Sequence, residues 1–281
     1  MPVSSGWEAG IFLVFFRFFL RGMKESLLLT RGLPPAPSSG GAFRQEDCPA
    51  AERHGFGYEA SPPSRCQPIL YSMSHKRHPI RGRLNSWFLA AADEPMHREY
   101  GRRKLGIFGD LPPVIVELGP GSGANFRYYP RGTRVVAVEP NPMMLKRMYA
   151  QAHKYGVEID LRHAGAEGME VESDSADLVV STLVLCTVHD PEQVVSEVQR
   201  VLKPGGRFAF LEHVAAAPGS RLRKVQDAIH RPWRWLGEGC HLSRDTASTI
   251  ENAGFGQLHL ESFDGPRRTP FQPHISGVAI R

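Results

Sequence analysis

Short apolar runs and amphipathic stretches alternate along the chain from residue 114 to its end. Runs of about four to eight apolar residues, rich in β-branched side chains, are typical of buried strands. The run at 176–185 is apolar almost throughout, as in a strand that is buried on both faces. The pattern predicts seven strands, at 114–118, 134–139, 157–163, 176–185, 207–214, 257–263 and 274–280.

The stretches between these strands carry helix signals. Asn141-Pro142 and Asp190-Pro191 each place a capping side chain before a proline at the first helical position, where the missing N–H costs no hydrogen bond. Apolar residues then recur on one helical face. We expect a short helix after the loop 119–123, helices after 141 and after 190 (the latter ending at the Lys-Pro-Gly-Gly turn 203–206), and helices at 219–236 and 244–253.

Strands that alternate with helices predict an α/β fold with a doubly wound, Rossmann-like seven-stranded sheet. We assign this domain to residues 73–281 and expect its compact part to begin near Pro79. Residues 33–68 contain seven prolines among serines, glycines and scattered charges. Residues 1–72 are therefore predicted to be a disordered, low-complexity extension, and Met73 is a candidate for the natural start.

The extension contains one apolar segment, "GIFLVFFRFFL". It is shorter than the roughly 20 residues that a spanning helix needs, and it lacks the flanks of a signal peptide. Peripheral contact with a membrane interface, or a transit peptide, remains open.

The charge pattern adds one further candidate for membrane contact. The net charge of the chain is +5, and the stretch 76–104 alone has an excess of five positive charges. This stretch is either a solvated helix face or a surface for an anionic partner such as lipid head groups. It carries no nucleic-acid motif, so no nucleic-acid partner is expected.

The four cysteines show no C-x-x-C spacing and no paired His/Cys pattern, so we expect no metal site. Cys186 lies in an apolar run and is expected to be a buried free thiol in a reducing compartment.

The motif "VIVELGPGSG" at 114–123 carries the main chemical signal. Glycines at 119, 121 and 123 would let a ligand approach the backbone closely, and doubly wound sheets bind ligands at the carboxyl ends of their strands. Glu139, at the end of the second strand, could accept hydrogen bonds from both hydroxyls of a ribose. A dinucleotide fits this much equally well, because "GPGSGA" satisfies G-x-G-x-x-A.

Other features favour a different nucleoside. Glu117 precedes the glycines, where a carboxylate would repel a pyrophosphate and suit a cationic ligand. Together with "VVAVEPNP", the acidic loop before "ADLVV", and "RVLKPGGRF", residues 114–214 resemble the class I S-adenosylmethionine-dependent methyltransferases. The resemblance implies S-adenosylmethionine as cofactor and a small-molecule methyl acceptor.

A closer resemblance extends over residues 85–281. "STLVLCTVHD", "LEHVAA", "EGCHLSRD" and "PHISGVAI" are similar to the methyltransferase-like thiol S-methyltransferases and to related small bacterial methyltransferases. This implies S-methylation of an apolar thiol. Animal members have a hydrophobic N-terminal anchor on the endoplasmic reticulum or on lipid droplets, which residues 1–72 do not match. We therefore expect a cytoplasmic protein, with a membrane surface of that kind as the alternative.

The resemblance also assigns cofactor-binding roles by position. It puts the three glycines against the methionine part of the cofactor, Glu117 near its amino group and Glu139 on its ribose. Adenine contacts fall at Ala166 and Glu167, although the class often has Asp where this chain has Gly165. Thr182 borders the pocket floor. The implied cofactor-binding set is Glu117, Gly119, Gly121, Gly123, Glu139, Ala166, Glu167 and Thr182.

The acceptor side is less defined. His213 and His189 follow predicted strands and are the candidate catalytic bases for a thiol, with His274 as a third; each could equally be structural. Cys240 and His241 either line the acceptor pocket or form a turn. Trp233 and Trp235 either form an apolar wall for the acceptor or pack in the core.

Three functional hypotheses stay open. The first is a methyltransferase for an apolar thiol or, alternatively, for a lipid-like or quinone-type amine or hydroxyl. The second is a nicotinamide-dependent oxidoreductase, which Glu117 and the "LKPGG" turn disfavour. The third is a non-catalytic interaction protein with this fold. Nothing in the sequence indicates an oligomeric state.

Overall fold

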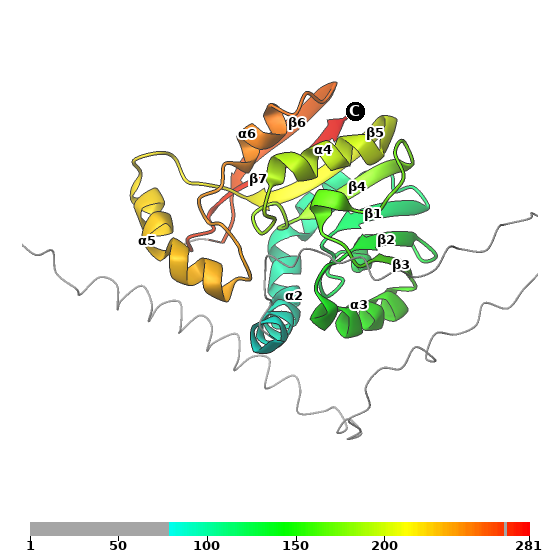
Figure 1. The fold of residues 1–281 in the computed structure, drawn as a ribbon, viewed down its shortest axis with the longest axis horizontal. Coiled ribbons are helices and arrows are strands. Elements are labelled where there is room, and N and C mark those ends of the chain that lie inside the picture. The colour runs from blue at the N-terminus through cyan, green and yellow to red at the C-terminus, as the bar shows by residue number, and fades with distance from the viewer. Residues whose placement is uncertain (1–78, 267–268) are drawn as a thin grey trace, which may run out of the picture. The chain divides into compact units, whose positions relative to one another are not determined.

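A seven-stranded sheet in the order β3-β2-β1-β4-β5-β7-β6 organises the computed structural model, which describes residues 79–266 and 269–281 (Figure 1). β1 to β5 are parallel, and β7 lies antiparallel between β5 and β6. The predicted doubly wound fold is confirmed. The strands are β1 (Val114–Leu118), β2 (Arg134–Val138), β3 (Glu158–Arg162), β4 (Ala176–Thr182), β5 (Leu202–His213), β6 (Gln257–Asp264) and β7 (Pro273–Ile280).

The helices cover both faces of the sheet. Alternate strand residues supply the two cores: Ile115 and Val135 pack on the face covered by α2 and α3, whereas Val116 and Val136 pack on the face covered by α4 and α6. The helices are α2 (Pro79–Phe108), η3 (Phe126–Tyr128), α3 (Pro142–Tyr155), η4 (Ala166–Gly168), α4 (Pro191–Val201), α5 (Arg221–Leu236) and α6 (Thr246–Glu251).

The two predicted caps are confirmed. The Asn141 side chain accepts a hydrogen bond from the backbone N–H of Met143 at the start of α3. The Asp190 side chain accepts one from Gln193 at the start of α4. These caps begin each helix directly beyond a sheet edge, so the loops that precede them lie at the carboxyl ends of the strands.

Two predicted boundaries were wrong. β4 ends at Thr182 rather than at 185, because Leu183 adopts a φ of 58° and turns the chain out of the sheet. Residues 183–190 therefore form a loop. The Lys-Pro-Gly-Gly stretch does not end a helix; α4 stops at Val201 and these residues belong to β5, where Gly205 donates a backbone hydrogen bond to Arg281.

Helix α2 agrees with the solvated helix face that was one of the two interpretations of the stretch 76–104, although its charged and apolar residues show no helical stripe that would have set its bounds. It contains most of the basic stretch 76–104. Lys104 was counted with that basic surface, which was wrong, because its side chain is buried with only 3% of it exposed. Arg98 and Arg102 are exposed on the same helix.

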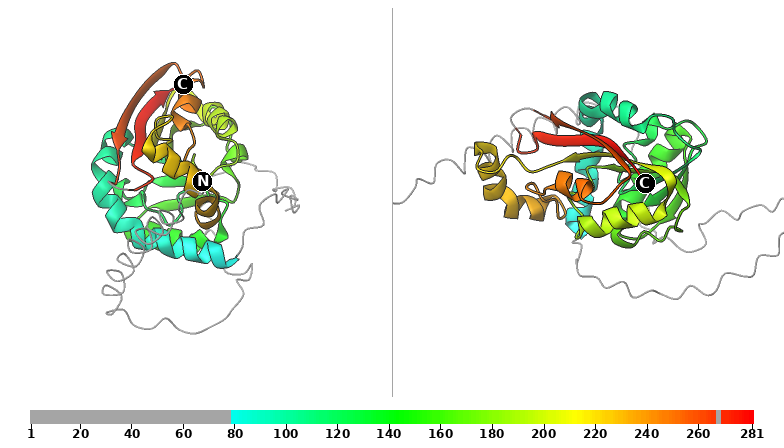
Figure 2. Two further views of the ribbon diagram at one scale, coloured as in Figure 1. Left: turned by 90° about the vertical axis from the view of Figure 1, so that its left-hand side faces the viewer. Right: turned by 90° about the horizontal axis from the view of Figure 1, so that it is seen from above.

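Figure 1 and the right-hand view of Figure 2 show α5 at one end of the described part, on the side away from α3. No helix among the described residues is both long enough and apolar enough to cross a bilayer. The apolar segment and the linker that were predicted within residues 1–72 lie outside the described residues.

Candidate functional site

Glu139 lies directly beyond β2 and anchors the glycine loop. Its Oε2 accepts a hydrogen bond from the backbone N–H of Gly121 at 3.0 Å, and its Oε1 accepts one from Asn141 at 2.7 Å. The residue is 5% exposed. A carboxylate has two acceptor oxygens, which match the two neighbouring hydroxyls of a ribose. Glu139 therefore fits the predicted ribose contact.

Glu117, within β1, is the centre of a buried polar network. Its Oε1 accepts a hydrogen bond from Asn125 Nδ2 at 2.8 Å, and its Oε2 accepts one from the Tyr129 hydroxyl at 2.9 Å. Burial raises the pKa of this carboxyl to about 7, partly offset by the two hydrogen bonds. Because the chain itself bonds both oxygens, Glu117 holds the loop 119–125 in place as well as lying beneath it.

Lys104 and Asn125 complete this network, and the sequence did not indicate either. Lys104 Nζ donates to Asn125 Oδ1 at 2.7 Å. Burial lowers the pKa of this lysine to about 8, against the opposing effect of the Glu117 carboxylate. Asn125 Nδ2 also donates to Thr182 Oγ1 at 2.9 Å. The end of β4 is thereby joined to the end of β1. The one signal in the sequence that could have marked Asn125 is its position two residues after Gly123, at the end of the glycine motif.

Glycine is needed at positions 119, 121 and 123 of the loop for different structural reasons. Gly119 has a φ of 51°, and a Cβ there would lie 2.9 Å from Val184 Cγ2 in the loop after β4. Gly123 has a φ of 84°, and its Cβ would meet the Phe126 ring at 2.7 Å. Gly121 has a φ of 57° and donates to Glu139. Gly119 and Gly123 thus allow side chains of the chain itself to pack closely on the loop, whereas Gly121 brings its backbone N–H to Glu139.

Ala166 and Glu167 lie in η4, beside the loop after β4. Ala166 is buried, and Glu167 Oε1 accepts a hydrogen bond from the backbone N–H of His189 at 2.8 Å. These contacts neither support nor oppose an adenine at this position, which stays a prediction. His189 is exposed. His189 therefore lies outside the buried group described below.

Glu212, near the end of β5, fixes the loop after β4 from below. Its Oε1 accepts hydrogen bonds from Ser181 Oγ at 2.7 Å and from the Val184 N–H at 3.2 Å, and its Oε2 accepts one from the Leu185 N–H at 3.1 Å. Burial raises the pKa of this carboxyl. A buried carboxylate that receives three donors rigidly sets the path of residues 183–186.

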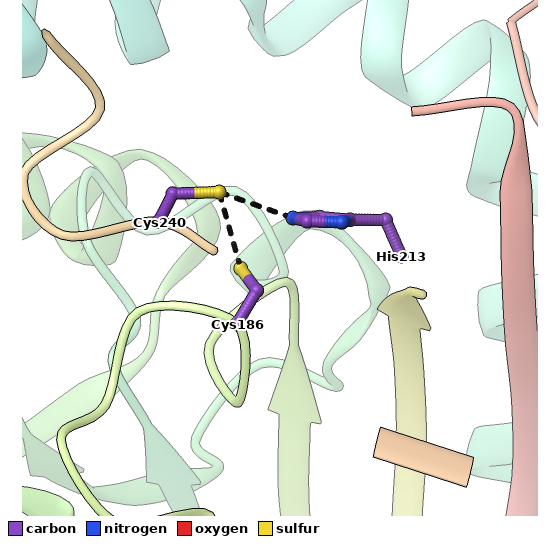
Figure 3. Close-up of side chains that lie close together, drawn as sticks. All are labelled: Cys186, His213 and Cys240. Carbon is purple, nitrogen blue, oxygen red and sulfur yellow. Dashed lines mark hydrogen bonds between the residues drawn. The ribbon is translucent and has the colours of Figure 1, made fainter. Parts of the chain in front are cut away.

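Cys186, His213 and Cys240 converge at this loop (Figure 3). His213 Nε2 lies 3.2 Å from Cys240 Sγ, and Cys240 Sγ lies 3.7 Å from Cys186 Sγ. All three residues are buried. The sequence spacing concealed this cluster, because Cys240 is separated from His213 by 27 positions and from Cys186 by 54.

The cluster has unequal thiols. The hydrogen bond between the two sulfurs lowers the pKa of Cys240, with burial opposing it. The same hydrogen bond, together with burial, raises the pKa of Cys186. Cys240 is therefore the more acidic sulfur, and it faces the imidazole of His213. Burial lowers the pKa of that imidazole, but the thiol of Cys186 and the carboxylate of Glu212 raise it overall.

Aromatic rings line the outer side of His213. The Phe271 ring lies 5.6 Å from the His213 ring and 4.7 Å from the Trp233 ring of α5. Trp235, which was paired with Trp233 as a candidate wall, is 62% exposed. His274 is buried against the Tyr100 hydroxyl, and burial lowers its pKa to about 4. Its ring is held by that contact and lies 6.3 Å from the ring of His213.

The segment 238–244 crosses the ends of several strands. Glu238 accepts a hydrogen bond from Asn141 Nδ2, beyond β2, at 3.1 Å. His241 donates its backbone N–H to the Cys186 carbonyl at 2.8 Å. Arg244 Nη1 donates to the carbonyls of Leu185 and Val188, both at 2.7 Å. This segment holds Cys240 at the strand ends, on the same edge of the sheet as Glu139.

The arrangement fits a nucleoside with a charged tail. Glu139 offers a carboxylate at the end of β2, and the glycine loop lies beside it through its bond to Gly121. Beyond the ends of β4 and β5 the chain presents the two thiols and the imidazole of Cys186, Cys240 and His213 in place of a second carboxylate ligand. The carboxyl edge of the sheet therefore combines a candidate nucleoside-binding site, which we call the nucleoside seat (Glu139 and the glycine loop 119–123), with the buried cluster of Cys186, His213 and Cys240 on the acceptor side.

Comparisons with known proteins agree with this geometry. A family model described as a methyltransferase domain matches residues 116–210, from β1 to β5. A solved S-adenosylmethionine-dependent methyltransferase of Thermotoga maritima has a TM-score of 0.50 at 17% identity, covering 71% of this chain and 99% of that chain. At that identity the likeness concerns the fold alone.

Curated relatives match over a longer stretch. The thiol S-methyltransferase TMT1B of Mus musculus is 37% identical over 207 residues, which cover 69% of this chain and 85% of that protein. The thiol S-methyltransferase TMT1A of Homo sapiens is 38% identical over 207 residues, with the same two coverages.

Proposed function

The chain belongs to the thiol S-methyltransferase family, and on that premise we propose that it transfers a methyl group from S-adenosylmethionine to the sulfur of a small apolar thiol. It is an S-adenosylmethionine-dependent methyltransferase; the thiol acceptor and the roles of single residues are the proposed part. Bound S-adenosylmethionine supplies a methyl group on a positively charged sulfur.

The cofactor roles follow from the contacts at the ends of β1 and β2. Glu139 binds the ribose hydroxyls while its bonds to Gly121 and Asn141 keep it oriented. Gly119 and Gly121 lie against the methionine part. Glu117 acts from beneath this loop, where it fixes Asn125 and contributes negative charge near the cationic part of the ligand. Thr182 borders the same seat through Asn125.

The acceptor side must hold a sulfur in line with the methyl group and promote loss of its proton. Holding two reactants in a productive orientation contributes about 7–11 kcal/mol in favourable systems. A free thiol has a pKa of about 8.5, and its thiolate is the attacking form. We assign the promotion of this ionisation to His213, whose imidazole is buried beside Cys240 at the end of β5.

The surroundings of His213 support an apolar acceptor. Phe271 and Trp233 place aromatic rings beside the imidazole, so the carbon part of a thiol can be buried there. A lipid-like or quinone-type amine or hydroxyl would ask for a hydrogen-bond donor or acceptor at its reacting atom. Two of the three residues in the cluster are thiols, which are weak hydrogen-bond partners, and this favours a thiol acceptor.

One observation carries the proposal: the nucleoside seat at Glu139 and the cluster at His213 lie at the carboxyl ends of the parallel strands of one sheet. An acceptor screen with methyl-labelled S-adenosylmethionine tests it. A labelled methyl thioether is expected from apolar thiols. Tight cofactor binding without methylation of any thiol, amine or hydroxyl would instead support a non-catalytic interaction protein.

The site of action is part of the same proposal. We propose a cytoplasmic enzyme, with the exposed arginines of α2 as the described surface for any peripheral contact with anionic lipid. Flotation of the full chain with vesicles that contain anionic lipid, beside a chain that starts at Met73, tests this contact. If only the full chain binds the vesicles, residues 1–72 make the contact and the arginines of α2 do not.

A further inference from the structure

We propose that Cys186, His213 and Cys240 form a metal site of the zinc class, and that the fourth ligand position of this metal binds the sulfur of the acceptor thiol. The metal site itself rests on the cluster alone. The assignment of its fourth position rests on the proposed thiol S-methyltransferase function.

The spacing of the three donor atoms is that of a tetrahedral site. Zinc–sulfur and zinc–nitrogen bonds place two sulfurs about 3.8 Å apart and a sulfur and a nitrogen about 3.6 Å apart in a tetrahedron. Cys186 Sγ and Cys240 Sγ are 3.7 Å apart, and His213 Nε2 is 3.2 Å from Cys240 Sγ. All three atoms lie within 4.8 Å of one another. A shift of a few tenths of an ångström brings them into coordination.

The donor set selects soft or borderline metals. Two thiolates and one imidazole suit zinc, whereas oxygen-preferring ions such as magnesium and calcium are disfavoured. Structural zinc sites are closed by four protein ligands, and catalytic zinc sites keep three with one open position. Among the described residues this group offers three ligands. It therefore matches the catalytic pattern.

The cluster is poorly satisfied by its own hydrogen bonds. His213 is 4% exposed, and its Nε2, the nitrogen that faces the cluster, has thiols as its hydrogen-bond partners. Thiols are weak donors and weak acceptors. Burying an imidazole and two thiols with such weak partners has a cost that a bound metal would remove.

The charges also balance. A divalent metal with two cysteine thiolates is neutral, so it can be buried without a large penalty. A third thiolate, from the acceptor, would add one negative charge. The Arg244 guanidinium lies close by, since its Nη1 bonds the carbonyls on either side of Cys186, those of Leu185 and Val188. The positive sulfonium of the methyl donor would reduce this charge further.

The metal gives His213 a defined role in the reaction. Coordination deprotonates the acceptor thiol outright, so its proton goes to solvent rather than onto the imidazole. The acceptor sulfur then forms a bond to the methyl carbon while the bond from that carbon to the sulfonium sulfur breaks, and its electron pair stays on S-adenosylhomocysteine. Nothing is oxidised or reduced. The neutral thioether is a weaker ligand than the thiolate and leaves.

Metal content of the purified full chain is the first test. We expect about one zinc ion per chain from cells supplied with zinc, and at least a tenfold loss in Cys186→Ala and in His213→Ala. Cys48→Ala is the matched control, a cysteine outside the described residues, and keeps the metal. Calorimetric binding of S-adenosylhomocysteine shows that the variants are folded. Wild-type protein without stoichiometric metal, even after incubation with zinc under reducing conditions, overturns the site.

A second measurement tests the main competitor, which is a disulfide between Cys186 and Cys240. The two sulfurs are close enough that a disulfide could form with a small movement. A Cys186–Cys240 disulfide found by mass spectrometry in protein isolated under thiol-blocking conditions would overturn the metal site, because both ligands would be consumed.

Cobalt substitution tests the fourth position. Tetrahedral cobalt in the site should show sulfur-to-metal charge transfer, and butanethiol should shift its visible bands while butanol should not. A bound cobalt that ignores butanethiol, in an enzyme that still methylates thiols, overturns the fourth-position assignment. A cobalt spectrum that responds to butanethiol without any methyl transfer leaves the metal site standing and contradicts the proposed function instead.

Discussion

The carboxylate of Glu139 and the backbone N–H of Gly121 lie 3.0 Å apart, although 18 positions separate them in the chain. This contact joins the end of β2 to the turn that follows β1. It orients the only carboxylate that we assign to the cofactor ribose, and it keeps the glycine loop open at the sheet edge. The nucleoside seat is therefore one connected unit.

Replacement of Glu139 tests this unit. Glu139→Ala should weaken S-adenosylhomocysteine binding about 10- to 100-fold, because hydrogen bonds to a charged acceptor contribute about 1.5–3 kcal/mol each. Isothermal titration calorimetry measures the change. Glu251→Ala, an exposed carboxylate in α6, serves as the control and should bind as the wild type does. An unchanged affinity in Glu139→Ala would show that the ribose assignment is wrong.

Gly119 should tolerate no side chain. Gly119→Ala should lower the free energy of unfolding by about 1–3 kcal/mol, since its φ of 51° disfavours an L-residue and the new Cβ would crowd Val184. Gly132→Ala is matched, with a φ of 85° and nothing within 4 Å of its Cβ, and should show only the backbone cost. Equal losses in urea unfolding of the two variants would mean that contact with the loop after β4 does not matter.

The buried carboxyl of Glu117 predicts a pH dependence of stability. Its pKa is raised from 4.5 to about 7 by burial, so its contribution to stability is fully present below about pH 4.5 and is lost as the pH rises through about 7. Folded protein holds a proton in this window that unfolded protein has released. The stability of wild type minus that of Glu117→Gln should therefore fall by about 1–3 kcal/mol between these pH values.

Chemical unfolding at several pH values measures this difference. Glu251→Gln, a change of an exposed carboxylate in α6, is measured in parallel as the control. A flat difference for Glu117→Gln would mean that the carboxyl is ionised throughout the window, and that Lys104 and the two hydrogen bonds outweigh burial.

His213 should affect turnover and leave cofactor binding intact. His213→Ala is expected to lower kcat for thiol methylation by about 100- to 1,000-fold, because the group that promotes thiol ionisation is lost. S-Adenosylhomocysteine affinity should change less than about twofold, since His213 lies on the acceptor side. His259→Ala, an exposed histidine of β6, is the control. Full activity of His213→Ala would show that a different residue promotes ionisation of the acceptor thiol.

Much of the fold was predictable because its signals are local. Proline after Asn141 and after Asp190 begins two helices, and the β-branched runs become β1, β2 and β4. The end of β4 was not predictable, because Leu183 is apolar yet leaves the sheet through a left-handed backbone turn. Helix α2 has no amphipathic stripe that would have marked it.

The residues of the site also divide into those with a local sequence signal and those without one. Glu139 and the glycines were found because they adjoin predicted strands. Lys104 resembled a surface charge until the fold placed it against Asn125. Cys186 and Cys240 meet His213 only through the path of residues 238–244 over the strand ends. A contact between residues 54 positions apart leaves no trace in spacing, and the expectation of no metal-ligand set rested on spacing alone.

The most direct test of the central claim is a single-turnover measurement of methyl transfer to sulfur. The full chain is mixed with methyl-labelled S-adenosylmethionine and butanethiol, and with butanol or butylamine in parallel. We predict that the label appears in butyl methyl sulfide with an equal amount of S-adenosylhomocysteine, and that the alcohol and the amine stay unlabelled. Tight binding of S-adenosylhomocysteine with no label on butanethiol or on any longer alkanethiol would contradict the account.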